Sequence, residues 1–184
     1  MNSDKLKGFS VLSLTEGIQF GHVVAPLFDP ATLALRAFQI EGDGQSFLVP
    51  LDQVGTIGTD ALLVENSRMT RAVTAAGAFG SLVAFDALRH LKVVNAAGTL
   101  LGTLRDLESD LATGAPLRLT IHKGGFLHLG GETLTIEGLA ISGVGHDLIT
   151  IANVVTTPVT APNNATAPPT TNVTAPDAVN VRIS

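Results

Sequence analysis

The chain has 184 residues, of which 11 are basic, 16 are acidic and none is cysteine. The lack of cysteine excludes disulfides, thiolate metal sites and thiol nucleophiles. The net charge of −5 and the absence of Trp and Tyr argue against direct binding of nucleic acid, which relies on basic and aromatic surfaces.

The sequence does not predict a membrane span. The longest charge-free apolar run, residues 72–85, has 14 residues, whereas a spanning helix needs about 20. Residues 1–7 are not followed by the apolar stretch of a secretory signal. We therefore expect a cytoplasmic protein without a transmembrane segment.

An internal repeat organises the chain. Residues 17–29 recur as residues 98–110, and each segment has a glycine, a second glycine four residues on and an aspartate eight residues after that. Two further pairs of segments align, namely 40–44 with 121–125 and 58–64 with 145–151. A repeat of this kind predicts two small units of similar fold.

The first copy is a series of short β-strands separated by turns. Pro26 is expected to stop the second strand, and turns are expected at residues 29–32 and 41–44. Such closely spaced strands and turns predict a small β-barrel or sandwich. The expected strands lie at residues 9–13, 18–25, 33–40, 47–49, 56–57 and 62–64.

Residues 66–86 interrupt this pattern and are expected to form a partly helical connector. Ser67 would cap a helix over residues 68–83, which is expected to pack on one or both barrels. The apolar face of this helix would hold Val73, Ala76, Phe79 and Val83.

The second copy shows a cleaner alternation. In residues 117–122 and 133–137 the apolar side chains share one face, as in a sheet with one face in the core and the other in water. The expected core residues are Leu100, Leu104, Leu107, Leu119, Ile121, Leu134, Ile136, Ile141, Ile149 and Ile151.

The predicted fold is therefore all-β, with two tandem small β-barrels at residues 5–65 and 87–154. The connector at residues 66–86 joins them. Residues 155–184 are rich in Thr, Pro, Ala and Asn, which predicts a disordered tail.

Both copies share a motif. In the first copy it comprises Leu6, Gly8, Val11, Gly17, Gly21, Val23, Asp29, Pro30, Thr32, Pro50 and Val54; in the second, Leu88, Lys92, Val93, Gly98, Gly102, Leu104, Asp106, Thr113 and Gly114. This motif resembles the PRC-barrel domain, which also occurs in the photosynthetic reaction centre H subunit and in the ribosome maturation factor RimM. The resemblance implies one small barrel per copy and no catalytic chemistry, because family members act mostly as interaction or assembly modules. The second copy departs from the motif with Glu137-Gly138 in place of Pro50-Leu51.

Histidines are the first candidates for a metal site. His122 and His128 flank a predicted hairpin and would face each other across strands, with Glu132 and Glu137 as the nearest carboxylates. Histidines on a polar sheet face explain the same spacing, so we expect no metal site and no cofactor. The chain's histidines are His22, His90, His122, His128 and His146.

Aspartates recur at equivalent places, Asp29 with Asp110 and Asp60 with Asp147. Catalysis by carboxylates would need two of them in one site, whereas these are spread over separate turns. We therefore interpret them as turn residues that bind their own backbone.

Two further motifs suggest catalysis or phosphate binding only superficially. Ser142, His146 and Asp147 lie too close in sequence to converge as a catalytic triad. The paired glycines, Gly17 with Gly21 and Gly98 with Gly102, lack the Lys-Ser/Thr of a phosphate-binding loop and precede strands rather than helices. We expect no catalytic residue and no cofactor-binding residue.

A locally basic region surrounds the connector, with Arg68, Arg71, Arg89 and Lys92. It would either dock an acidic partner or neutralise the acidic barrels beside it, and we favour neutralisation. The overall prediction is a non-enzymatic interaction or scaffold module that binds a protein partner. The module could also form a homo-oligomer. The alternative hypotheses are a ribosome-assembly or RNA-processing factor that acts through a protein partner, and a peripheral subunit of a membrane complex.

Overall fold

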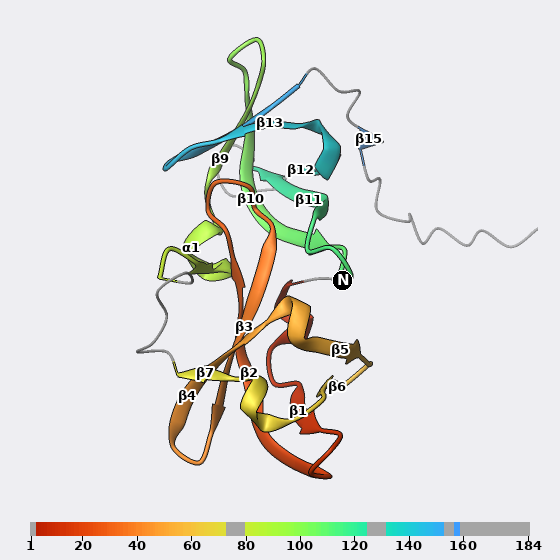
Figure 1. Cartoon of the computed structure of the whole chain (residues 1–184). Coiled ribbons are helices and arrows are strands. Elements are labelled where there is room, and N and C mark those ends of the chain that lie inside the picture. Colours follow the sequence, from red (N-terminus) through yellow and green to blue (C-terminus); the bar gives the residue numbers. More distant parts are fainter. Residues whose placement is uncertain (1–2, 73–79, 125–131, 153–156, 159–184) are drawn as a thin grey trace, which may run out of the picture.

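The computed structural model describes residues 3–72, 80–124, 132–152 and 157–158, and it contains two β-sheets. In Figure 1 the first sheet, coloured red to yellow, lies below the second, coloured green to blue, and the two meet near the middle of the view. The predicted all-β fold is thus confirmed.

The first sheet has the strand order β5-β6-β1-β2-β3-β4-β7, with β8 added beside β2. Its strands are β1 (Ser10–Ser13), β2 (Ile18–Phe28), β3 (Leu35–Gly42), β4 (Gln45–Pro50), β5 (Val54–Ile57), β6 (Ala61–Val64), β7 (Arg71–Ala72) and β8 (Val83–Ala84).

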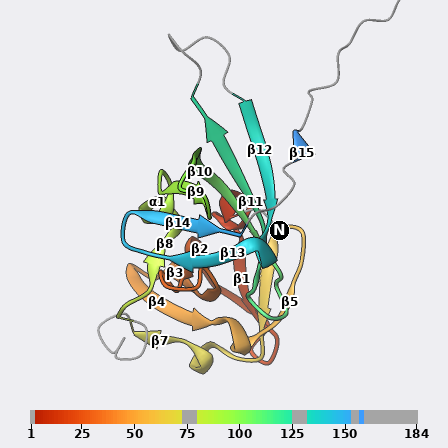
Figure 2. The same cartoon turned by 90° about the horizontal axis from the view of Figure 1, so that it is seen from above.

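The second sheet repeats this topology, with the order β13-β14-β9-β10-β11-β12-β15. In Figure 2, β13 and β14 run across the direction of β11 and β12, as expected for a sheet that curls into a barrel. Its strands are β9 (Lys92–Asn95), β10 (Leu100–Ser109), β11 (Pro116–Lys123), β12 (Glu132–Glu137), β13 (Ile141–Val144), β14 (Leu148–Ile151) and β15 (Thr157–Pro158).

Short helical turns occupy matching places in the two halves. The turn η1 (Ser3–Leu6) precedes β1, and α1 (Phe85–Leu88) precedes β9. Likewise η2 (Leu51–Gln53) follows β4, and η7 (Gly138–Ala140) follows β12. The two halves therefore have the same succession of elements.

The two halves also share positive backbone φ angles at equivalent positions. Gly8 follows η1 with φ of 83°, and His90 follows α1 with φ of 79°. In the loops after β2 and β10, Leu33 has φ of 58° and Gly114 has φ of 75°. A left-handed residue thus occurs at both of these matching places in each unit, and each unit has glycine at only one of the two.

Most of the residues predicted for the core of the second half are buried. The predicted leucines and isoleucines of β10, β11, β12 and β14 are buried, apart from Leu100, whose exposed fraction of 54% shows that its assignment was wrong. Leu100 begins β10 directly after the turn at Gly98. Ile141 is only half-buried.

The prediction that Leu117 shares the core face of β11 with Leu119 is also wrong, because Leu117 is 48% exposed. The pairing of β10 with β11 shifts register between Glu108 and Ser109, opposite the start of β11. A register shift turns the side chains beyond it away from the face they would otherwise share.

Pro26 does not stop β2, because the strand continues to Phe28. On one side of β2, β1 pairs with residues 18–22 and β8 pairs with residues 27–28. Pro26 lies in the gap between these two partners on that side of β2 and opposite Phe38 of β3 on the other side. Proline is tolerated in a strand where one side has no partner.

The helix expected over residues 68–83 is not formed in the described residues. Asn66 rather than Ser67 caps a single short turn, η3 (Ser67–Met69), and the chain then pairs with the first sheet as β7 and later as β8. At Arg71–Ala72 and Val83–Ala84, pairing with the first sheet therefore prevails over the helical spacing of the apolar residues. The predicted helix residues Val73, Ala76 and Phe79 lie outside the described part of the chain.

The tail was predicted to begin at residue 155, yet Thr157–Pro158 pair with β12 as β15. This strand corresponds to β7 of the first sheet. Residues 159–184, where the rest of the predicted disordered tail falls, lie outside the described residues.

One apolar core runs through both sheets. Its members include Phe28, Leu35 and Phe38 of the first sheet together with Leu107 and Leu119 of the second. A barrel of this size buries little apolar surface by itself, so each half completes the core of the other.

A hydrogen bond crosses the contact between the halves, from Leu35 N to Gly114 O at 2.8 Å. The matching residue of Leu35 in β11 is Pro116, which has no N–H to donate in return. A Cβ on Gly114 would overlap Leu35 O and would lie 3.0 Å from Leu51 Cδ2. The two halves thus meet closely at this glycine.

We expect Gly114→Ala to lower the free energy of unfolding by about 2–3 kcal/mol, because a left-handed conformation costs an L-residue about 1–2 kcal/mol and the added methyl group strains the Leu35 hydrogen bond. Gly8→Ala is the matched control, since its φ is similar but its Cβ meets open space. It should cost about 1 kcal/mol. Equal losses in urea unfolding would contradict a close contact at Gly114.

Candidate interaction surface

The contact between the two halves is built from two short helical turns. The turn η1 of the first half contacts β10 of the second sheet, and α1 of the second half contacts β2 of the first sheet. Each unit therefore places the turn before its first strand against the other unit. We call this contact the seam.

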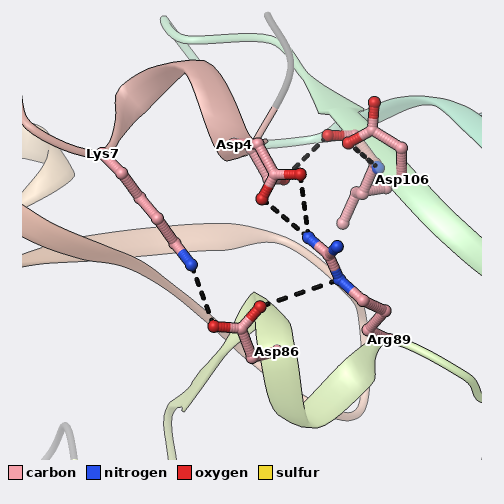
Figure 3. Close-up of polar contacts among 7 residues, drawn as sticks. Asp4, Lys7, Asp86, Arg89 and Asp106 are labelled. Carbon is pink, nitrogen blue, oxygen red and sulfur yellow. Dashed lines mark hydrogen bonds and ion pairs between the residues drawn. The ribbon is translucent and has the colours of Figure 1, made fainter.

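Two ion pairs cross the seam reciprocally (Figure 3). Arg89 Nη2 lies 2.7 Å from Asp4 Oδ1, and Lys7 Nζ lies 2.9 Å from Asp86 Oδ2. Asp4 and Asp86 occupy the second position of their turns, and Lys7 and Arg89 directly follow them. The same contact is thus made twice with the roles exchanged, as in the two-fold interface of a homodimer.

The two sides of the seam differ in what they bury. On one side, the Phe28 and Phe85 rings meet edge to face at 6.0 Å, and the Arg89 guanidinium lies 5.1 Å from the centre of the Phe85 ring. On the other side the matching positions hold buried Ser109 and Ser3. Ser3 Oγ donates a hydrogen bond to Leu107 O at 2.8 Å. The aromatic side adds packing that the serine side lacks.

Asp106 lies beside these ion pairs and is half-buried (Figure 3). Burial raises the pKa of the Asp106 carboxyl, the negative charges of Asp4 and Glu108 add to this effect, and the hydrogen bond from Leu107 N opposes it. Asp86 behaves in the opposite way, because the hydrogen bond from Lys7 lowers its pKa. The seam thus contains two carboxyl groups whose pKa values are shifted in opposite directions, that of Asp106 upward and that of Asp86 downward.

The recurrent aspartates act as turn residues. Asp29 Oδ1 accepts a hydrogen bond from Ala31 N at 2.9 Å, and Asp110 Oδ1 accepts one from Ala112 N at 2.8 Å. This hydrogen bond lowers the pKa of Asp110. These contacts confirm the interpretation of Asp29 and Asp110 as residues that bind their own backbone.

Asp60 and Asp147 also make local contacts. Asp60 Oδ2 accepts a hydrogen bond from Thr59 Oγ1 at 3.0 Å, and Asp147 Oδ1 lies 2.7 Å from His146 Nδ1. Ser142 Oγ instead donates to Thr150 O at 3.0 Å. Ser142 and the His146–Asp147 pair thus take part in separate hydrogen bonds.

His22, His90, His122 and His146 are exposed, and His128 lies outside the described residues. Glu132 is exposed, and Glu137 Oε1 lies 3.7 Å from Arg118 Nε. Among the described side chains, no three of the His, Asp and Glu residues are grouped as metal ligands. The proposed facing of His122 and His128 falls outside the described part of the chain.

The recurring glycines have a mechanical role. Gly17 and Gly98 adopt φ of 65° and 78° in the turns before β2 and β10. A Cβ on Gly21 would overlap Glu41 O, and a Cβ on Gly102 would overlap His122 O. These glycines therefore allow neighbouring strands to approach.

The basic region around the connector does not form a single patch. Arg89 is largely buried and is paired with Asp4 and Asp86, which agrees with neutralisation at that residue. Arg68 and Lys92 are exposed, and the side chain of Arg71 lies outside the described set.

At two matching positions the second half exposes a leucine where the first half has a charged residue. Leu139, at the centre of η7, is 100% exposed, and Leu117 of β11 is 48% exposed. The matching residues of the first half are Asp52 at the centre of η2 and Arg36 of β3. We call Leu117 and Leu139 the leucine surface; our sequence reasoning missed it, although comparing residues 52 and 139 between the copies would have found it.

A groove of about 380 Å³ adjoins the leucine surface. All its lining residues are uncharged: Ala31, Thr32, Pro116, Gly138, Leu139, Ile141, Ser142, Gly143 and Val144. The matching groove of the first half, of about 360 Å³, contains Asp52 where this one contains Leu139. Each groove combines the loop after β2 or β10 of one unit with the other unit's outermost strand.

A larger pocket of about 410 Å³ lies between the halves. Asp29, Arg36 and Asp52 supply its charges, and Leu51 and Leu82 are among its apolar residues. Within the described segments, no helix is long and apolar enough to cross a lipid bilayer.

Charge reversal tests the reciprocal ion pairs. Asp4→Lys with Lys7→Asp places like charges opposite Arg89 and Asp86, and we expect the free energy of unfolding to fall by about 1–2 kcal/mol. Adding Asp86→Lys and Arg89→Asp restores opposite charges, and about half of the loss should return, because aspartate cannot stack on Phe85. Urea unfolding with and without added salt measures both effects, and a further loss in the four-residue variant would contradict the reciprocal pairing.

Asp106→Asn tests the raised pKa of Asp106. As the pH rises from the ordinary aspartate value of about 3.9 through the raised pKa, the folded protein ionises a half-buried group and loses stability. We expect the Asn variant to be more stable than the wild type at neutral pH and equally stable in acid, as measured by thermal unfolding from pH 3 to 7.

Asp86→Asn is the control of opposite sign. Because the pKa of Asp86 is lowered, its ionised form stabilises the fold above the ordinary aspartate value, and that contribution is lost as the pH falls through the lowered pKa. This variant should be less stable than the wild type at neutral pH. A similar pH dependence in both variants would contradict the assignment.

Comparison with known proteins adds one relationship. A search of curated proteins finds no match to this chain. A family model does match the second half, from β8 through β14. Residues 82–155 thus match the PRC-barrel domain family, as the resemblance of the second copy implied.

Proposed function

We propose that the chain is a non-catalytic protein-binding module made of two PRC-barrel-type units, with its docking surface at Leu117 and Leu139. The single observation that carries this proposal is the exposure of these leucines, 48% and 100% respectively. These two leucines are distinguished from single exposed leucines by the uncharged groove that adjoins them, because a contiguous exposed apolar surface marks a site of interaction.

The first half supplies the internal comparison. Arg36 and Asp52 occupy the same places in a sheet of the same topology, so the barrel accepts charged residues there. The fold therefore does not require leucine at positions 117 and 139, which supports a role for both side chains in binding a partner. The shared topology and left-handed positions also support the first half as a second PRC-barrel-type unit.

The polar groups support a non-catalytic role. The charged residues of the seam are bound to one another, and Asp29 and Asp110 are bound to their own loops. A catalytic site needs an acid, a base or a nucleophile that is positioned toward a substrate. The second half instead offers an uncharged groove beside exposed leucines.

The test replaces the leucine surface with the residues of the first half, Leu117→Arg and Leu139→Asp. Because the first half carries these residues in the same fold, the variant is expected to fold normally. Affinity purification of the tagged chain from native lysate, with quantitative mass spectrometry, should recover the partner with wild type and lose it about tenfold or more with the variant.

Leu14→Asp is the control, since Leu14 is 62% exposed but lies in the turn before β2. Recovery of the partner by the Leu117/Leu139 variant as well as by Leu14→Asp would contradict the proposal. Nuclease treatment distinguishes the alternatives, because a ribosome-assembly factor would recover ribosomal proteins in a nuclease-sensitive manner. Recovery of integral membrane proteins from detergent extracts would instead identify a peripheral membrane subunit.

A further inference from the structure

The outermost strand of the second sheet, β13, has a backbone edge that the described strands do not cover. β13 pairs with β14 on one side and ends the strand order of its sheet. Its residues, Ile141–Val144, include no charge and no proline. An uncharged edge strand without proline is well suited to accept another strand.

The uncharged groove runs beside this edge. Ile141 and Val144 are half-buried and line it together with fully exposed Leu139. A strand that adds to β13 would satisfy its backbone hydrogen bonds on the edge, while alternate side chains would enter the groove. The best occupant is therefore an extended segment with an apolar residue at every second position.

The first half shows that chain beyond the last barrel strand can return to the same barrel. After β7, which pairs with β4, the chain comes back as β8 beside β2. The last strand of the second half, β15, pairs with β12 in the matching place. Residues 159–184 follow it.

The end of the chain has the required pattern. Val179, Val181 and Ile183 alternate with Asn180 and Arg182, and β-branched residues with this period favour a strand. The 20 residues 159–178 connect β15 to this segment. A linker of this length spans about 25 Å as a flexible coil and about 60 Å when its prolines hold it extended. Both lengths are enough to cross a small barrel, so the segment can reach the groove of its own chain.

We propose that residues 179–183 add to the edge of β13 of the same chain and place Val179, Val181 and Ile183 in the groove beside Leu139. This inference rests on the proposed function, because the segment would cover part of the leucine surface. Residues 179–183 would thus compete with the external partner for Leu139.

Hydrogen–deuterium exchange on the full chain tests the strand addition. Val181→Asp should speed exchange of the β13 amides that point away from β14 by about tenfold, because an aspartate side chain is excluded from an apolar groove. Val173→Asp is the matched control, since it places the same charge in the Pro- and Thr-rich part of the tail, and it should leave β13 unchanged. Unchanged β13 exchange in Val181→Asp overturns the proposal.

A peptide of residues 178–184 provides the test in trans. Added to the Val181→Asp chain, it should restore slow exchange in β13 with saturation, whereas a peptide that carries the same substitution should not. Protection of β5 instead of β13 would overturn the proposal and would favour the groove of the first half.

Partner recovery separates this inference from the proposed function. Release of the segment in Val181→Asp should increase the amount of partner recovered, because the leucine surface is uncovered. If Val181→Asp changes neither β13 exchange nor partner recovery, while Leu117→Arg with Leu139→Asp abolishes recovery, the strand addition fails and the docking surface stands. If Val181→Asp changes β13 exchange but Leu117→Arg with Leu139→Asp leaves partner recovery unchanged, the strand addition stands and the proposed docking surface fails.

Discussion

The shared core between the two sheets is the constraint on which the rest of the structure depends. Each unit is a small barrel, and a unit of that size exposes a large part of its apolar surface. The core continues from Phe28 and Leu35 of the first sheet to Leu107 and Leu119 of the second. Both units therefore keep the same loop geometry where they meet, including a left-handed residue at Leu33 and at Gly114.

The reciprocal ion pairs contribute alignment more than energy. Their partners are partly exposed, with 53% of Asp4 and 63% of Asp86 accessible, and ion pairs of this kind add little to stability. Their value lies in geometry, because a charge from each turn fixes how the opposite unit is placed along the seam. The apolar core holds the halves together, and the charged turns determine their register.

The repeat and the alternation predicted much of the fold. The spacing of Gly17, Gly21 and Asp29 and its recurrence indicated two units with matching turns, since these residues are required by backbone geometry. The alternation failed at Leu117, because the register shift between β10 and β11 skips this residue and such a shift is not visible in the local sequence. The seam could not be predicted either, since the match of Asp4 and Lys7 with Asp86 and Arg89 does not reveal that the pairs cross between units.

The difference between Leu139 and Asp52 has a consequence for stoichiometry. Two identical units related by a two-fold axis would carry every surface feature twice, and a change in one unit would appear in both. Here the two units belong to one chain, so the second half can have Leu139 where the first half has Asp52. Within the described residues the uncharged groove therefore occurs once, in the second half, and the docking surface proposed here would be monovalent despite the near-symmetric framework.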